Sequence, residues 1–350
     1  MHELLERSGT IVMVSHSLGT VQEFCDRVMW LDHGEVQQIG DPATVIAAYR
    51  ARYTLGDTQL LRDSRSESDV LARPADVRLP DPLDIEAMRA HRASTPPAPY
   101  ADPDPVVAPD RSPKRARKLI EVGWRRGPGD VVSLESPISW NEGHPADGQL
   151  HALAPVGVLL TAYGQAPDRG WLQAAAAVAV DWVAHHQLPD RGPAWDPGIT
   201  GLRAHRLAAL IDHLAADPLS SDAALKSLTS AAQVHATALS DEPQSDVPGV
   251  AAIYDPVGLR QLAIRVPELP GAPDLLALAD TRTNRLLTTS FADDGVHLEH
   301  TPSYHAEVVE TLTRLLDAGA IDDTKPTKVR NRAEKALAWF VVPDGSIAGF

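Results

Sequence analysis

The last two thirds of the sequence repeat one pattern, with apolar residues at positions i, i+3, i+4 and i+7, which is the spacing of an amphipathic α-helix. Gly, Pro and Asp interrupt the pattern between segments. The segments are 148–164, 171–187, 198–216, 222–239, 274–291, 303–319 and 328–342. Helices of this length with short connections form either an α-solenoid or a toroid of helical hairpins. The absence of a repeat of fixed period favours the toroid, so we expect a mostly α domain over residues 118–350.

Two unlike regions precede this domain. Residues 1–55 have an α/β pattern, with a short apolar strand at Thr10–Val14, a strand-turn-strand pattern over 28–40 and a helix capped by Asp41. Residues 56–117 are dense in charge and proline and lose the apolar periodicity. We interpret 56–117 as a linker that is largely disordered or extended. The sequence therefore predicts three parts, 1–55, 56–117 and 118–350.

Charge and cysteine content exclude several classes of protein. The formal net charge is −15, which argues against nucleic acid as a partner because a phosphate backbone requires a basic surface. The single cysteine excludes an internal disulfide framework and a cysteine-based zinc site. We expect no metal and no cofactor. No secretory signal or membrane-length apolar run is present, so we expect no direct membrane insertion.

The N-terminal segment resembles the last part of an ABC-transporter ATPase domain, most of all the polysaccharide-export type. The resemblance lies in IVMVSHSLGTVQEFCDRVMWLDHGEVQQIGDPATVIAAY, residues 11–49. It implies that His16 matches the switch histidine that contacts the nucleotide γ-phosphate. No G-x-x-x-x-G-K-[ST] phosphate loop occurs in the sequence, so we expect no ATP binding. We favour a remnant fused to another domain over a working ATPase.

The helical part resembles the heparinase II/III family of polysaccharide lyases. Three pieces carry the resemblance in the family's order: RGPAWDPGITGLRAHRLAALIDHL (191–214), FADDGVHLEHTPSYHAEVVETL (291–312) and WFVVPDGSIAGF (339–350). The resemblance implies an incomplete (α/α) toroid, which is normally followed by a β-sandwich. It also implies β-elimination on uronic-acid glycans and an acidic polysaccharide or oligosaccharide as the partner.

The resemblance places Tyr304 at the position of the catalytic acid. A tyrosine keeps its proton at neutral pH because its pKa is near 10, so it can protonate the departing O4 oxygen. Pro302 marks a helix start, and the positive end of a helix dipole favours an anionic substrate. His305 points about 100° round the helix from Tyr304 and becomes a substrate-binding candidate, as does Glu299 as a local hydrogen-bond acceptor. A half-buried core tyrosine is an equally consistent interpretation of Tyr304.

Two residues of the 191–214 segment complete the candidate site. Arg203 can supply a cationic floor to a cleft in an acidic protein. Trp195 can stack on a sugar ring, although a packing role is as consistent with its A-W-D-P turn. Arg206, three residues after Arg203, is expected to be a solvated surface arginine. His185 and His186 are neighbours on a helix and diverge, so we do not expect them to form a metal site.

One departure from the family's pattern concerns the neutraliser of the substrate carboxylate. The family carries an Asn-His pair shortly before a G-L-x-Q helix, whereas Pro256 and Val257 precede Gly258 here. Neither residue can neutralise a uronate, which puts catalytic competence in question. Three interpretations stay open: a lyase-like protein, a non-catalytic glycan-binding or assembly module of a surface-polysaccharide cluster, and a fragment of an ABC-transporter ATP-binding subunit. The compartment stays open, because the ATPase-like segment and the lack of a signal peptide suggest the cytoplasm, whereas lyases of this family usually work outside it.

Overall fold

The computed structural model consists of two compact units, Met1–Arg78 with Phe350, and Leu79–Gly349. The residues that the structure describes are 25–32, 35–46, 48, 79–104, 111–127, 129–140, 147–189, 192–241, 250–298, 301–322, 324–341 and 347. The expected strand over 10–14, together with His16, lies outside these residues.

The described part of the first unit is a β-hairpin followed by a short helical stretch. Strands β1 (Val28–Asp32) and β2 (Glu35–Gly40) pair antiparallel, as the sequence predicted. Residues 42–46 are helical, and the carboxylate of Asp41 accepts a hydrogen bond from the Thr44 amide at 3.1 Å. Asp41 is therefore the expected cap of this helical stretch.

The second unit begins with a segment that the sequence analysis interpreted as part of a linker. Helix α4 (Ile85–Ser94) buries Ile85, Met88 and Arg92. The interpretation is wrong for residues 79–104, since Arg92 forms a buried ion pair with Asp212 at 2.5 Å. A charged side chain can be buried when it is paired, so high charge content did not indicate disorder here. We call residues 79–104 the strap.

A short helix and a second hairpin follow the strap. Helix α5 (Ser112–Val122) ends at Gly123, whose φ of 108° favours glycine. Strands β3 (Trp124–Gly127) and β4 (Asp130–Val132) then pair antiparallel. Helix α5 also extends the second unit into the residues that were expected to form a linker, whereas the hairpin lies within the expected domain 118–350.

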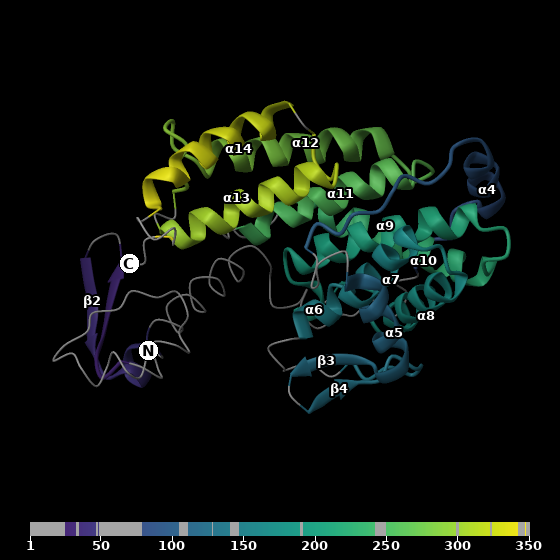
Figure 1. Ribbon diagram of the computed structural model, residues 1–350, viewed down its shortest axis with the longest axis horizontal. Helices are drawn as coiled ribbons and strands as arrows, with labels where there is room; N and C mark the ends of the chain where they lie inside the picture. Colours follow the sequence, from purple (N-terminus) through teal and green to yellow (C-terminus); the bar gives the residue numbers. More distant parts are fainter. Residues whose placement is uncertain are drawn as a thin grey trace, which may run out of the picture. The chain divides into compact units, whose positions relative to one another are not determined.

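The remaining helices form the incomplete (α/α) toroid, and Figure 1 shows them as successive helices packed side by side. They are α6 (Asp147–His151), α7 (Ala154–Gln165), α8 (Arg169–His185), α9 (Ile199–Ala216), α10 (Asp222–Ser240), α11 (Tyr254–Arg265), α12 (Ala272–Thr289), α13 (Pro302–Asp317) and α14 (Thr324–Leu337). Helix α7 packs on α8, α9 on α10, α11 on α12, and α13 on α14. None of the helices in the described ranges combines the length and hydrophobicity needed to span a bilayer.

Helix α9 lies at the centre of this unit and packs on α4, α7, α8, α10 and α11. Its crossing with α11 is very close, because Gly201 of α9 and Gly258 of α11 face each other. A Cβ atom on Gly201 would lie 2.1 Å from the Tyr254 carbonyl oxygen, and one on Gly258 would lie 2.3 Å from the Gly201 carbonyl oxygen. Both positions therefore require glycine, and the crossing fixes α11 against α9.

Candidate functional site

The turn that carries Tyr304 is the first turn of α13. The helix begins at Pro302 after an extended Thr301, so the Tyr304 side chain projects from the helix N-terminus. Tyr304 is half-buried against the smaller of two hydrophobic clusters. Its ring meets the ring of His297 edge-on, with centroids 5.3 Å apart. The Tyr304 and His297 rings therefore pack together at the N-terminus of α13.

His305 is buried beside this site and is held by the backbone on both sides. Its Nδ1 accepts a hydrogen bond from the His297 amide at 3.1 Å. Its Nε2 lies 2.8 Å from the carbonyl oxygen of Ala333 on α14. Because the amide only donates and the carbonyl oxygen only accepts, Nδ1 is the acceptor and Nε2 carries the proton. Both ring nitrogens are thus engaged, and the contacts favour a structural role over the expected substrate contact.

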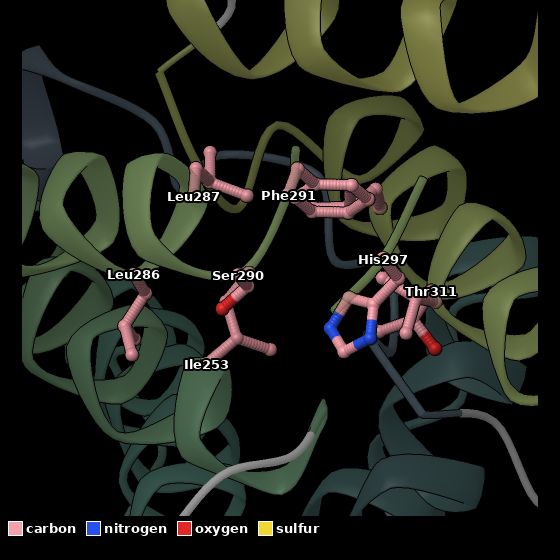
Figure 2. A pocket seen from close by; sticks show the side chains of 9 residues that line it. Ile253, Leu286, Leu287, Ser290, Phe291, His297 and Thr311 are labelled. Atoms are coloured by element: carbon pink, nitrogen blue, oxygen red, sulfur yellow. The ribbon is translucent and has the colours of Figure 1, made fainter. Parts of the chain in front are cut away.

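An open pocket lies between α12, α13 and the Phe291–His297 turn. Its volume is about 360 Å³, which includes solvent space at the opening. Figure 2 shows His297 and Thr311 on one side of it and Leu286 on the other. The pocket is mainly apolar, and its polar side chains are those of Ser290, His297 and Thr311. Tyr304 is not among the lining residues, so its link to the pocket is the His297 ring.

Arg203 lies deep inside the unit and is enclosed by aromatic rings. Its guanidinium carbon lies 4.0 Å from the ring centroid of Trp182 and 4.8 Å from that of Trp195. Nε donates to Nε2 of His235 at 2.8 Å, and a terminal nitrogen donates to the carbonyl oxygens of His151 at 2.9 Å and Ala194 at 2.5 Å. Such contacts stabilise a buried guanidinium, and the charge of Asp255 also favours its protonated form.

The protonation states around Arg203 follow from burial. Burial lowers the pKa of Arg203 to about 9, which leaves it protonated at neutral pH. Burial and the neighbouring Arg203 hold the pKa of His235 well below its ordinary value. His235 is therefore neutral, accepts from Arg203 through Nε2 and donates through Nδ1 to the Ala231 carbonyl oxygen at 2.8 Å. Arg203 is fully buried, so these contacts favour a structural role over the expected floor of a cleft.

Trp195 ends the short 3-10 helix Pro193–Trp195 and is half-buried. Its ring lies 4.8 Å from that of His235 and 5.6 Å from that of Trp182, centroid to centroid. Together with the Arg203 contact, these distances describe a packing role for much of the indole. Only its partly exposed remainder can meet a ligand.

The residues before Gly258, where the family carries the side chain that neutralises the substrate carboxylate, have a structural role here and connect α11 with α9. Pro256 and Val257 are buried in the first turn of α11. The preceding Asp255 accepts hydrogen bonds from the amides of Gly198 at 2.9 Å and Gly201 at 3.1 Å, so it caps the N-terminus of α9. Burial raises the pKa of Asp255 to about 6, against the effect of these two bonds.

Arg206 corrects the expectation of a solvated surface arginine. Its side chain is fully buried and pairs with Asp102 of the strap at 2.8 Å. It also donates to the carbonyl oxygens of Ala152 at 2.9 Å and Asp104 at 3.0 Å. Arg206 therefore holds the strap against the toroid.

Two expected site residues, Glu299 and His16, lie outside the described residues. The structure places His297 beside Tyr304. In the sequence, the D-D-G motif before His297 indicates a turn at this position. The His235 and Trp182 contacts with Arg203 carried no such signal, because these residues come from helices far apart in the sequence. Chemically, the described residues offer a phenol whose ring packs on an imidazole ring at the N-terminus of a helix.

The fold of the second unit is also found in solved lyases. The heparan sulfate lyase HepC from Pedobacter heparinus superposes with a TM-score of 0.53 and 15% identity, covering 75% of this chain and 44% of that one. A heparinase III structure superposes with a TM-score of 0.57 and 16% identity, covering 74% of this chain and 43% of that one. The chain thus spans less than half the length of these two proteins, and the likeness concerns the fold.

Short stretches of the chain match export ATPases. The O-antigen export system ATP-binding protein RfbB of Myxococcus xanthus is 41% identical over 59 residues, which are 17% of this chain and 14% of that protein. The teichoic acids export ATP-binding protein TagH of Listeria innocua is 45% identical over 49 residues, 14% of this chain and 15% of that protein. The chain therefore spans only a small part of the length of these relatives. In the helical part, the sequence model described as Heparinase II/III N-terminus matches residues 130–346.

Proposed function

We propose that the helical unit of this chain, which belongs to the heparinase II/III family, acts on uronic-acid-containing glycans by β-elimination. The family membership rests on residues 130–346, which match the model of the family's N-terminal part. The observation that carries the proposal is the pair formed by Tyr304 and His297 at the N-terminus of α13. The family membership supplies the reaction class, and the local geometry supplies a proton donor.

In the proposed reaction a base removes the C5 proton of the uronate, and the C4–O4 bond breaks as the C4–C5 double bond forms. Tyr304 gives its phenolic proton to the departing O4 oxygen and regains a proton from solvent before the next cycle. The N-terminal end of the α13 dipole stabilises the transient phenolate. His297, edge-on to the phenol at 5.3 Å between centroids, limits the positions that the Tyr304 ring can take.

A second candidate function is a non-catalytic glycan-binding or assembly module. The observation that favours it is that the first turn of α11 has a structural role. Pro256 and Val257 are buried there, and Asp255 caps α9. A uronate near these residues meets no neutralising side chain among them. A glycan can still bind such a protein while the C5 anion stays too costly to form.

Substitution of Tyr304 by Phe tests the enzymatic proposal. The wild-type protein is expected to produce 4,5-unsaturated uronate, seen as new ultraviolet absorbance, from one or more uronate polymers. Tyr304→Phe is expected to lower this rate at least a hundredfold, because proton transfer by a positioned side chain contributes roughly 10²–10⁴-fold. The phenyl ring keeps the contact with His297, so the variant should retain the wild-type melting temperature.

Titration calorimetry with the same polymers separates the two candidates. Binding with no unsaturated product from the wild-type protein favours the non-catalytic module. Product formation that persists in Tyr304→Phe removes the phenol from the mechanism. Trp171→Phe, at a buried position in α8, is the matched aromatic control and should leave the rate unchanged.

A further inference from the structure

Helix α14 is basic within an acidic chain. Its 14 residues, TKPTKVRNRAEKAL, hold five basic side chains and one acidic side chain, whereas the whole chain has a formal net charge of −15. Figure 1 shows α14 at the margin of the helical unit, beside α12 and α13. The helix packs through a narrow face of small and apolar residues, which are Pro326, Val329, Ala333 and Ala336.

Four of the basic residues fall on one line of the exposed surface. They are Lys325, Lys328, Arg332 and Lys335, and all four are exposed. Their spacing of three, four and three residues keeps them within about 80° of each other round the helix, over a length of about 15 Å. We call these four residues the basic stripe.

An exposed indole continues the basic stripe. Trp339 follows Lys335 by four residues, in the 3-10 turn Ala338–Phe340, and is 88% exposed. The neighbouring Phe340 packs on His305 with ring centroids 5.5 Å apart, so the turn itself is anchored. A flat apolar face so placed is a stacking surface for a ring of a bound molecule.

The stripe is free to bind an anion. Among the described residues, no carboxylate pairs with Lys328, Arg332 or Lys335, and the one acidic residue of α14, Glu334, pairs with Arg330 on another side of the helix at 3.4 Å. Lys325 is steadied by neutral groups of α12, the Thr288 hydroxyl at 2.8 Å and the Asn284 carbonyl oxygen at 3.3 Å. Each ammonium or guanidinium group of the stripe therefore keeps its charge available.

We infer that the basic stripe and Trp339 bind a linear acidic glycan at a site separate from Tyr304. The inference shares the class of ligand with the proposed function but does not depend on turnover. A run of cations in line matches the carboxylates of an extended uronate chain, and Trp339 matches the apolar face of a sugar ring. The apolar face of α14 is used for packing, so the helix has no second face to insert into a lipid surface.

A uronate chain fits better than a nucleic acid. The chain carries 47 acidic against 32 basic residues, so a ligand with the charge density of a phosphate backbone is repelled by the rest of the surface. Three of the four cations in the stripe are lysines, which act as point charges and do not provide the bidentate geometry that favours phosphate.

The test is binding of fluorescently labelled oligogalacturonate, a polymer of uronic acid alone, to the full chain. The combined variant Lys328→Gln, Arg332→Gln and Lys335→Gln is expected to weaken binding about tenfold, because it removes three exposed charge contacts of modest strength. Trp339→Ala should weaken it severalfold, and wild-type binding should weaken as salt is added.

A matched control removes the same charges from another helix. Lys114→Gln, Arg117→Gln and Lys118→Gln remove two lysines and one arginine from exposed positions of α5. There the exposed Glu121 lies one turn from Arg117 and Lys118, and Trp124, the aromatic residue that follows α5, is buried, so we expect little change in binding. Equal weakening by both combined variants would overturn the inference in favour of general electrostatics.

Two further outcomes decide the class of ligand. Single-stranded DNA that binds as tightly as oligogalacturonate, through the same three residues, would overturn the assignment to a glycan. Unchanged oligogalacturonate affinity in the α14 variant would overturn the site itself. Tyr304→Phe is expected to retain wild-type affinity at the stripe, so loss of turnover and loss of this site are separate results.

Discussion

At the scale of single residues, two buried arginines show how differently neighbouring charges are stabilised in this protein. Arg203 and Arg206 lie three positions apart on α9, and both side chains are fully buried. Arg203 is stabilised by aromatic faces and carbonyl oxygens, whereas Arg206 is stabilised by the carboxylate of Asp102. Nearness in sequence therefore says little about the environment, because each guanidinium meets groups from other parts of the chain.

The Arg206–Asp102 pair predicts a large loss of stability when one charge is removed. Asp102→Asn leaves the Arg206 charge buried without its counter-charge, which is expected to lower the free energy of unfolding by about 3–5 kcal/mol. Urea denaturation followed by circular dichroism measures this change. In the wild-type protein burial lowers the pKa of Arg206 and Asp102 raises it. Without Asp102 the guanidinium is still expected to stay ionised at neutral pH, because an arginine does not deprotonate readily in a protein.

An exposed ion pair provides the control for this measurement. Glu334→Gln breaks the pair with Arg330, whose two side chains are 60% and 27% exposed, and it is expected to change stability by less than about 0.5 kcal/mol. If Asp102→Asn has an effect as small as that of Glu334→Gln, the strap is not held by this charge pair.

At the scale of elements, much of the toroid could be predicted from periodicity. The seven expected amphipathic segments correspond to α7, α8, α9, α10, α12, α13 and α14. Helix α11 was not found in this way because Pro256 and Gly258 lie in its first half, although the crossing with α9 requires the glycine. Helix α4 was missed because its buried Arg92 interrupts the apolar pattern.

The glycine crossing of α9 and α11 gives a prediction at this scale. Gly201→Ala gains about 1 kcal/mol of helix propensity but places a methyl group against the Tyr254 backbone, where a Cβ atom would lie 2.1 Å from the carbonyl oxygen. The two helices must separate, and we expect a net loss of about 2 kcal/mol or more. Thermal unfolding followed by circular dichroism measures the loss as a lower melting temperature.

Gly164→Ala on α7 is the matched substitution. A Cβ atom there meets nothing within 4 Å, so this variant should be as stable as the wild type or more stable by up to about 1 kcal/mol. A loss in Gly164→Ala equal to that in Gly201→Ala would mean that crowding at the crossing is not the cause.

The candidate site was less predictable than the helices. The position of Tyr304 in the first turn of α13 followed from Pro302, and this placement is confirmed. The role of Tyr304 stays a prediction. The engagement of both His305 nitrogens could not be foreseen, because one partner comes from the preceding turn and the other from α14. Hydrogen-bond partners that lie on other elements leave no periodic trace in a sequence.

At the scale of the whole molecule, the strap extends the helical unit in sequence, so that the unit begins before the helices of the toroid. Arg265 donates to the carbonyl oxygens of Ala98 at 2.9 Å and Pro99 at 2.8 Å, and Arg206 binds Asp102 and Asp104. A unit that begins at the expected boundary, residue 118, loses all of these contacts. Arg206 then keeps only the Ala152 carbonyl oxygen among the partners described, and its buried charge loses its counter-charge. The compact unit begins at Leu79 instead.

Two truncated chains test this boundary. A chain of residues 79–350 is expected to show a cooperative melting transition, because every contact of the strap is kept. A chain of residues 105–350 is expected to lose cooperativity or aggregate, since Arg206, Arg265 and Asp212 lose their partners in the strap. Differential scanning calorimetry compares the two, and equal melting temperatures would show that the strap is dispensable.

The strap also determines how the helical unit meets a mechanical load. A pull on the chain from residue 78 first reaches Asp81, whose carbonyl oxygen accepts from Gln233, and Leu83, whose amide donates to Thr229. It then reaches Arg89 and Arg92 on α4, and only afterwards the contacts at Asp102. Because these anchors are arranged one after another along the chain, we expect tension applied at residue 78 to break them in that order before it reaches the helices of the toroid.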